Sequence, residues 1–169
     1  MPSFSGGDGT SGNPFHVANV DDLNNIRYFR NANFIQNADI TFTFGTLFEP
    51  IGEIWEPFTG DFNGNGYIIS NLTIFNSENP DVGLFGAIEN SILSNITLEN
   101  ISITANSEFN FRIGGLVGSM ESSNISKSSA TGDITLYSNN CPYTQVQLGG
   151  LVGSNNMYFY GRFQGRNLL

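Results

Sequence analysis

Two short stretches of the chain place carboxylates where they could do chemistry. The first, DFNGNGYIISNL at residues 61–72, begins like a calcium loop, with an acid, two asparagines and a glycine in the expected places. Such a loop needs a bidentate acid at its twelfth position, which here is Leu72. We therefore interpret the stretch as a glycine-rich turn that leads into a strand. A surface calcium ion held by Asp61 is the alternative, with Asp8 in GGDGT as a second candidate ligand, and no other cofactor is expected.

The second stretch, GEIWEP at residues 52–57, places Glu53 and Glu56 on either side of Trp55, the only tryptophan of the chain. A pair of carboxylates is the catalytic equipment of a glycosidase, and an exposed tryptophan can stack on a sugar ring. These three residues are therefore the candidate ligand-binding residues. The competing interpretation, which we prefer from the sequence, is that Trp55 covers the first coil of the fold while both glutamates are simply solvated.

The composition argues against most enzymes and against several classes of partner. The chain has 169 residues, which suits one domain, and it carries a net charge of −9. That charge disfavours binding to nucleic acid, and no apolar run is long enough to insert into a membrane. Because the only lysine is Lys127 and the only histidine is His16, the usual general bases and metal ligands are scarce. We predict a protein that is not an enzyme.

Two short motifs alternate three times along the chain, and successive copies start 29 to 35 residues apart. One is Asn/Asp-apolar-Ser/Thr-apolar, at residues 71–74, 100–103 and 133–136. The other is Gly-Leu-apolar-Gly, whose glycines should allow positive φ or close backbone approach where the chain turns. These glycines are Gly83, Gly86, Gly115, Gly118, Gly150 and Gly153.

The residue types within the repeats favour strands over helices. Ile, Thr, Ser, Asn and Gly dominate them, and these residues suit strands and tight turns. In NITLENISIT, at residues 95–104, the apolar residues alternate and the alternation changes phase at Glu99–Asn100. Two short strands joined by a bend, both facing one core, account for that change. Stacked coils of such strands make a parallel β-helix, so we predict an all-β solenoid of four to five coils.

The N-terminal quarter differs from the repeats. Val20, Leu23 and Ile26 recur at helical spacing, and Asn19 or Asp21 can cap the first turn. A short helix placed before the coils would cover the core and the strand edges that the first coil leaves open. We therefore predict a short N-terminal capping helix.

The predicted organisation is one domain over residues 1–169. It divides into an N-terminal cap at 1–35, coils at 36–154, of which 38–52 form the first, and a C-terminal cap or docking tail at 155–169. The tail departs from the repeat because it is rich in aromatic residues and contains two arginines. An uncapped coil would present open strand edges, which favour stacking between molecules. The candidate residues for an assembly interface are Tyr158, Phe159, Tyr160, Arg162, Phe163 and Arg166.

Several stretches resemble one known family. They are FSGGDGTSGNPFHVANVDDLNNI, DITFTF, FEPIG, FTGDFNGNGYIISNLTI, VGLFG and the repeated GGLVG, and they cover about residues 4–154. In them the chain is similar to the GLUG-motif proteins, bacterial and archaeal cell-surface chains whose repeats also occur upstream of some immunoglobulin A metallopeptidases. The resemblance implies a right-handed parallel β-helix and a prokaryotic, extracellular or cell-surface protein. It supplies no catalytic residues, because the shared motifs are turn and core positions.

Together these observations predict a non-enzymatic surface protein, either an adhesion module or a self-assembling subunit of a filament or surface layer. Its partners would be copies of itself, or a glycan or protein on a host or cell surface. The alternative is a carbohydrate-binding module, or a weakly active carbohydrate enzyme, that uses Glu53, Trp55, Glu56 and Asp61.

Overall fold

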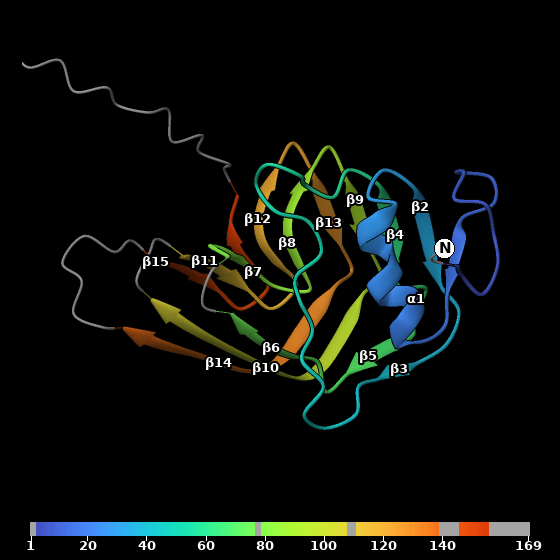
Figure 1. Cartoon of the computed structure of the whole chain (residues 1–169). Helices are drawn as coiled ribbons and strands as arrows, with labels where there is room; N and C mark the ends of the chain where they lie inside the picture. The colour runs from blue at the N-terminus through green and yellow to red at the C-terminus, as the bar shows by residue number, and fades with distance from the viewer. Residues whose placement is uncertain (1–2, 77–78, 108–110, 139–145, 156–169) are drawn as a thin grey trace, which may run out of the picture.

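The computed structural model describes residues 3–76, 79–107, 111–138 and 146–155. These residues form a β-solenoid in which strands of successive coils stack on one another (Figure 1). Each pair of named strands is parallel, so the predicted parallel, all-β fold is confirmed. None of the helices in the described ranges is long and apolar enough to cross a membrane.

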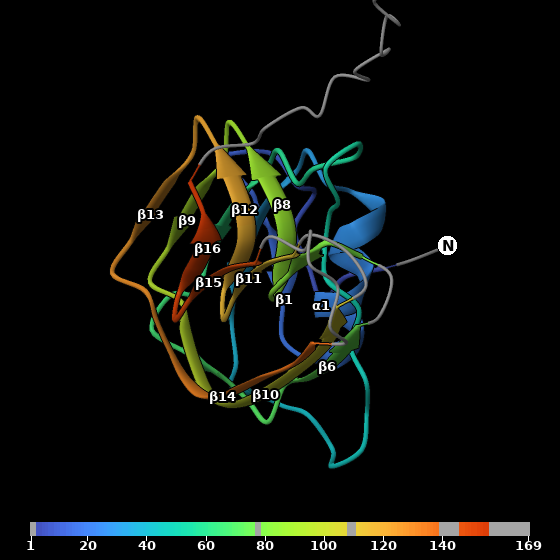
Figure 2. The same ribbon diagram turned by 90° about the vertical axis from the view of Figure 1, so that its left-hand side faces the viewer.

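In the described part of the chain, four sheets surround the core (Figure 2). The first contains β1 (Phe15–Val17), β2 (Asn33–Gln36), β4 (Asp61–Asn63), β9 (Ile92–Ser94) and β13 (Asn124–Ser126). The second contains β3 (Ile40–Thr41), β5 (Ile68–Ser70), β10 (Thr97–Ser107) and β14 (Ser129–Ser138), with β6 (Thr73–Asn76) also paired to β10. The third contains β7 (Asp81–Val82), β11 (Phe111–Gly114) and β15 (Val146–Gly149). The fourth contains β8 (Phe85–Glu89), β12 (Val117–Glu121) and β16 (Val152–Ser154).

The described residues complete about three coils, because the third and fourth sheets have three strands each. The prediction of four to five coils agrees with the number of strands only in the first two sheets. The prediction that residues 38–52 form a full coil is also wrong, since only Ile40–Thr41 within them is a strand. Beyond it the chain touches the next coil through isolated bridges. Pro50 and Pro57 contribute to this irregularity because proline has no N–H to donate to a ladder.

The core consists of apolar columns that run along the stacking direction. On the first sheet, residues paired in register place Phe34, Phe62 and Leu93 above one another, all at most 2% exposed. On the second sheet, Ile74 and Ile103 form an equivalent column. Apolar side chains therefore pack on apolar side chains from coil to coil, and this burial is the energetic reason for the repeat.

The phase change predicted at Glu99–Asn100 is present as a bulge within β10. Asn100 has a φ of 53° and Asn71, one coil earlier, has a φ of 60°. Asparagine tolerates this left-handed conformation better than most residues. The Asn100 side-chain amide also donates a hydrogen bond of 2.7 Å to the Asn71 side-chain oxygen. The bend is thus repeated and bonded from one coil to the next.

The N-terminal cap contains the predicted helix, α1 (Val20–Asn25), which continues into a 3-10 turn, η1 (Ile26–Tyr28). Asn19 caps it, because its side-chain oxygen accepts a hydrogen bond of 2.8 Å from the Asp22 backbone N–H. Leu23 and Ile26 are fully buried against the coils. Figure 2 shows α1 on the opposite side of the solenoid from β9 and β13. The capping helix is therefore confirmed.

The motif glycines serve close packing between the third and fourth sheets. None of the six has a positive φ, so close backbone approach is the correct alternative of the two predicted. A Cβ on Gly118 of β12 would lie 2.5 Å from the Val82 nitrogen and 2.7 Å from the Gly86 oxygen. A Cβ on Gly150 would have nothing within 4 Å. The same motif therefore contains positions where glycine is required and one where it is not.

One ion pair is buried in the third sheet. Asp81 on β7 is fully buried, and Arg112 on β11 donates a hydrogen bond of 2.8 Å from Nη2 to its Oδ2. The Arg112 Nε also donates to Oδ1, so the pair is bidentate. Burial raises the pKa of Asp81 above its ordinary value, and the Arg112 contacts offset part of that effect. The pair joins two coils through their side chains.

The two ends of the solenoid differ. At the start, the rings of Phe4, Phe15 and Phe29 pack together over the core, and the His16 N–H of β1 donates to the Gly6 oxygen. In the last described coil, β13 to β16 each pair with a neighbour on one side, within the part of the chain that the structure describes. Leu148 there is 57% exposed. We call this last coil, β13 to β16, the open end.

Candidate functional site

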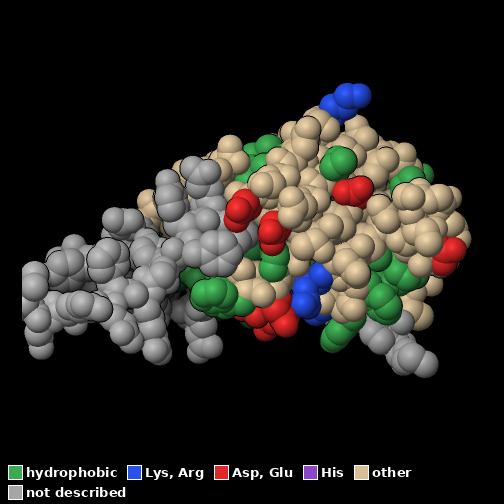
Figure 3. Space-filling model, turned by 90° about the horizontal axis from the view of Figure 1, so that it is seen from above, with side chains coloured by type: hydrophobic (Ala, Val, Ile, Leu, Met, Phe, Trp, Pro, Cys, Tyr) green, Lys and Arg blue, Asp and Glu red, His purple; other side chains and the backbone are tan. Residues whose placement is uncertain are grey.

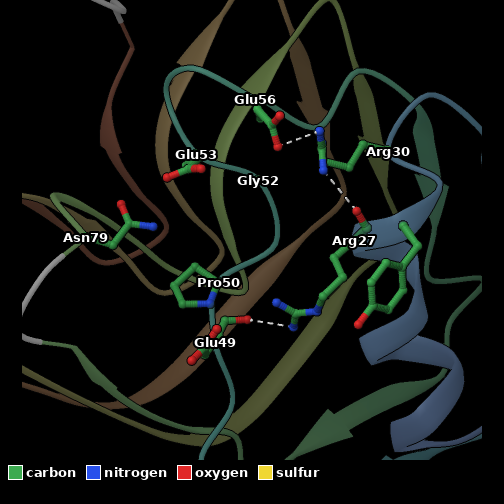
Figure 4. A pocket seen from close by; sticks show the side chains of 9 residues that line it. Arg27, Arg30, Glu49, Pro50, Gly52, Glu53, Glu56 and Asn79 are labelled. Carbon is green, nitrogen blue, oxygen red and sulfur yellow. Dashed lines mark hydrogen bonds and ion pairs between the residues drawn. The ribbon is translucent and has the colours of Figure 1, made fainter.

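A groove lies between the N-terminal cap and the irregular first coil (Figure 4). It encloses about 320 Å³, and we call it the arginine groove. It is lined by Arg27, Tyr28, Arg30, Glu49, Pro50, Gly52, Glu53, Glu56 and Asn79. Two further hollows share these walls and extend it, one toward Phe48 and Phe75 and the other toward Asn31 and Thr59. The site is therefore an open, polar channel and not a closed cavity.

One wall of the groove is the loop between Gly52 and Phe58, which protrudes from the first coil. We call it the ejected loop. The Ala87 N–H of β8 donates to the Gly52 oxygen, and the Ala87 oxygen accepts from the Phe58 N–H at 3.0 Å. The chain therefore leaves the coil and returns to it beside the same residue. Gly52 has a φ of 76°, and a Cβ there would lie 2.7 Å from both the Ala87 oxygen and the Phe58 nitrogen. Only glycine fits this exit point without strain.

Within the ejected loop, Glu53 and Glu56 exchange two backbone hydrogen bonds, of 3.1 and 2.9 Å. The turn that they close has Ile54 and Trp55 at its tip. Trp55 is 72% exposed, which does not fit the interpretation that it covers the first coil. Both glutamates are exposed, and both line the groove. The structure thus brings the three sequence-predicted ligand residues together on one short loop.

Arg27, on the opposite wall, is held in a fixed orientation. Its Nε and Nη2 donate to the Asn24 backbone and side-chain oxygens at 2.9 and 2.8 Å, and Nη2 also donates to the Glu49 backbone oxygen at 3.1 Å. The guanidinium carbon lies 5.4 Å from the centre of the Phe48 ring. Burial lowers the pKa of Arg27, and the nearby Glu49 carboxylate offsets part of that effect. An arginine nevertheless stays charged in proteins.

Arg30 connects the cap to the ejected loop. Its Nη2 donates to Glu56 Oε2 at 2.9 Å, and its Nη1 donates to the Arg27 backbone oxygen at 3.0 Å (Figure 4). The side chains of Arg30 and Glu56 are 33% and 61% exposed, so this ion pair contributes little to stability. A ligand can therefore compete for either partner at low cost.

Basic side chains are rare elsewhere on the described surface. Among residues 3–155 the other two are Arg112, which is buried with Asp81, and Lys127, which lies in the corner after β13. In Figure 3 the blue side chains are few, and some lie beside red ones on a mostly uncharged face. The arginine groove thus holds half of the described basic residues. Sequence reasoning did not single out Arg27 or Arg30, although two arginines three positions apart after a helix were a usable signal.

The two candidate calcium ligands lie outside the groove. Asp61 on β4 accepts a hydrogen bond of 2.9 Å from the Ile92 backbone N–H, which links it to the next coil. Asp8 accepts hydrogen bonds from the Thr10 backbone N–H and hydroxyl, and these bonds lower its pKa. Within the described ranges no three His, Cys, Asp or Glu side chains gather as a metal site would require. The GNG turn after Asp61 is present, with Asn65 at a φ of 53°.

The assembly candidates in the C-terminal tail, Tyr158 to Arg166, lie outside the described residues. The prediction about them therefore stays a prediction.

Comparison with known proteins identifies the repeat. The GLUG motif matches residues 109–135, which include β11, β12 and β13. The chain carries a GLUG motif. Halomucin from Haloquadratum walsbyi is 32% identical to it over 166 residues, which cover 89% of this GLUG-motif chain and 2% of halomucin. A putative Gly-rich membrane protein from Evansella cellulosilytica is 35% identical over 109 residues, which cover 60% of this chain and 13% of that protein.

The GLUG-motif chain therefore spans only a small part of each of these relatives. No solved structure matches it.

Proposed function

We propose that the GLUG-motif chain is a non-enzymatic, surface-associated adhesion module that binds glycans in the arginine groove. The GLUG motif and the two relatives, named as a halomucin and a membrane protein, support a surface-associated protein. The observation that carries the glycan proposal is the ejected loop. Because both ends of the loop are bonded to Ala87, the coil does not need residues 53–56 for its own ladder. The loop instead contributes Glu53 and Glu56 to a polar channel and exposes the only tryptophan, Trp55, at its tip.

The chemistry of the groove suits a sugar. Tyr28, which lines the groove, is 63% exposed, and Trp55, at the tip of the ejected loop, is 72% exposed. Such aromatic faces stack on the apolar face of a sugar ring. The glutamates accept hydrogen bonds from hydroxyl groups, and the arginines donate them. A site with a few converging polar groups and exposed aromatic rings is a common design for binding a small ligand.

Replacing Trp55 with alanine should reduce glycan affinity by at least about tenfold and leave the melting temperature nearly unchanged. The reason is that Trp55 is at the tip of a loop that the coil does not use. A glycan array read with the full chain would find ligands, and titration calorimetry would compare variants on the best one. Tyr137→Ala, which removes a 60% exposed aromatic side chain from β14, is the matched control. An array without binding, or equal affinity in the Trp55 variant, would contradict the proposal.

Self-assembly is the second candidate function, and the open end favours it. The edge strands of the last described coil and the exposed Leu148 offer backbone and apolar surface to another molecule. The start of the solenoid is covered by the cap, so contact through open ends would join two copies and then stop. This arrangement favours a closed dimer over a filament.

Light scattering across a range of protein concentrations should then show a dimer that dissociates in Leu148→Lys, because a charge in the contact is costly. Deletion of residues 156–169 would test the aromatic tail separately. A protein that stays monomeric at every concentration would contradict assembly through the open end, and long filaments in electron micrographs would contradict the closed dimer.

A further inference from the structure

We infer that the arginine groove selects glycans whose sugars carry a carboxylate, such as uronic acids. This inference rests on the proposed function, because it names the class of glycan that the groove would bind. It goes beyond the residues that the sequence singled out, since the carboxylate would be recognised by Arg27 and Arg30.

Arg27 is the first reason. The three hydrogen bonds that its guanidinium donates all reach neutral oxygens, two from Asn24 and one from the Glu49 backbone. Its Nη1 takes no part in them and remains able to donate. Among the described residues Arg30 is ion-paired with Glu56, whereas the nearby Glu49 carboxylate attracts Arg27 without forming an ion pair with it. Arg27 is therefore the arginine whose charge gains most from a carboxylate that a ligand supplies.

The second reason is preorganisation. The contacts with Asn24, Glu49 and Phe48 fix the plane of the Arg27 guanidinium before any ligand arrives. A fixed guanidinium loses little conformational entropy when it binds a planar carboxylate. The partial burial that lowers the pKa of Arg27 also strengthens its attraction to an anion, because the surrounding dielectric is lower.

The third reason concerns which anions fit. Three glutamates, Glu49, Glu53 and Glu56, line the same channel. They repel a densely charged polyanion, whereas a sugar with one carboxylate can place it at the arginines and present hydroxyls to the glutamates. The exposed ring of Tyr28 in the channel, with that of Trp55 at the tip of the loop that forms one wall, favours the sugar ring over a small inorganic anion. Together these features point to a carboxylated sugar.

The test compares galacturonic acid, a sugar with a single carboxylate, with its methyl ester, two probes that differ in the charge of the sugar carboxyl. Titration calorimetry with the full chain at low ionic strength should show affinity for the acid that is at least about tenfold higher than for the ester. Arg27→Gln and Arg30→Gln should each reduce affinity for the acid by about tenfold or more. Lys127→Gln, which removes the same charge away from the groove, is the matched control and should bind like the unmodified chain. Melting temperatures of all variants would exclude unfolding as the cause.

The outcomes separate the two proposals. If acid and ester bind equally, the inference about the carboxylate is wrong while glycan binding stands. If neither probe binds and a wider array is also empty, both proposals fail. If the acid binds but Lys127→Gln weakens it as much as Arg27→Gln and Arg30→Gln do, binding follows net charge and the groove is not the site.

Discussion

Replacing Gly118 with alanine should lower the free energy of unfolding by about 3 kcal/mol, whereas Gly150→Ala should change it little. Both residues belong to the same Gly-Leu-Val-Gly motif in successive copies. A Cβ on Gly118 would meet backbone atoms of Val82, Gly86 and Asp81 between 2.5 and 2.8 Å away, and backbone cannot turn aside as a side chain can. At Gly150 the new methyl group has open space.

Urea denaturation followed by circular dichroism would measure both variants. A loss of about 3 kcal/mol in a protein of this size corresponds to a fall of roughly 6 to 12 °C in melting temperature. Equal stability of the two variants would show that the third and fourth sheets can move apart, and that the motif glycines are not needed for close packing.

The second large effect is expected at the buried ion pair. Arg112→Gln should destabilise the fold by about 3 to 5 kcal/mol at pH 7, because it leaves the fully buried Asp81 carboxylate without its partner. Arg30→Gln removes the same group from the exposed pair with Glu56 and should cost less than about 1 kcal/mol. The two substitutions are chemically identical, so burial accounts for the difference.

The deficit of Arg112→Gln should shrink as the pH falls. Burial raises the pKa of Asp81 in the folded state above its unfolded value, so the folded protein binds the proton more tightly. Stability therefore decreases as the pH rises from the unfolded pKa of about 4 to the raised folded pKa, and it recovers at lower pH. Removing Arg112 strengthens this dependence. Urea titrations at pH 4 and pH 7 would check it, and a deficit that is the same at both values would show that Asp81 does not carry the cost.

The fold could be predicted because the spacing of the repeated motifs gives the length of one coil. The alternation of apolar residues and its phase change at Asn100 are local features, so the strands and the bend could be placed from the sequence alone. The number of complete coils could not be predicted in this way. It depends on whether residues 43–58 pair along their length with the coil above, and that is decided by contacts with β6 and β8.

The candidate site was only half predictable. Glu53, Trp55 and Glu56 are neighbours in the sequence, so their grouping was visible there. The groove requires Arg27 and Arg30 to lie opposite them, and the cap and the first coil meet only in the fold. The partnership of Asp81 with Arg112 was likewise hidden, although both precede a Gly-Leu motif by two or three residues, and stacking of the repeats would have suggested it.

The attachment of both ends of the ejected loop to Ala87 has a consequence for how such a protein can evolve. Insertions, deletions and substitutions between Gly52 and Phe58 leave the hydrogen-bond ladder of the neighbouring coil intact, and surface loops tolerate such changes well. Mutation could therefore exchange the recognition surface of the molecule while selection on the core stays constant. We therefore expect homologous coils to differ in the length of the loop at this point.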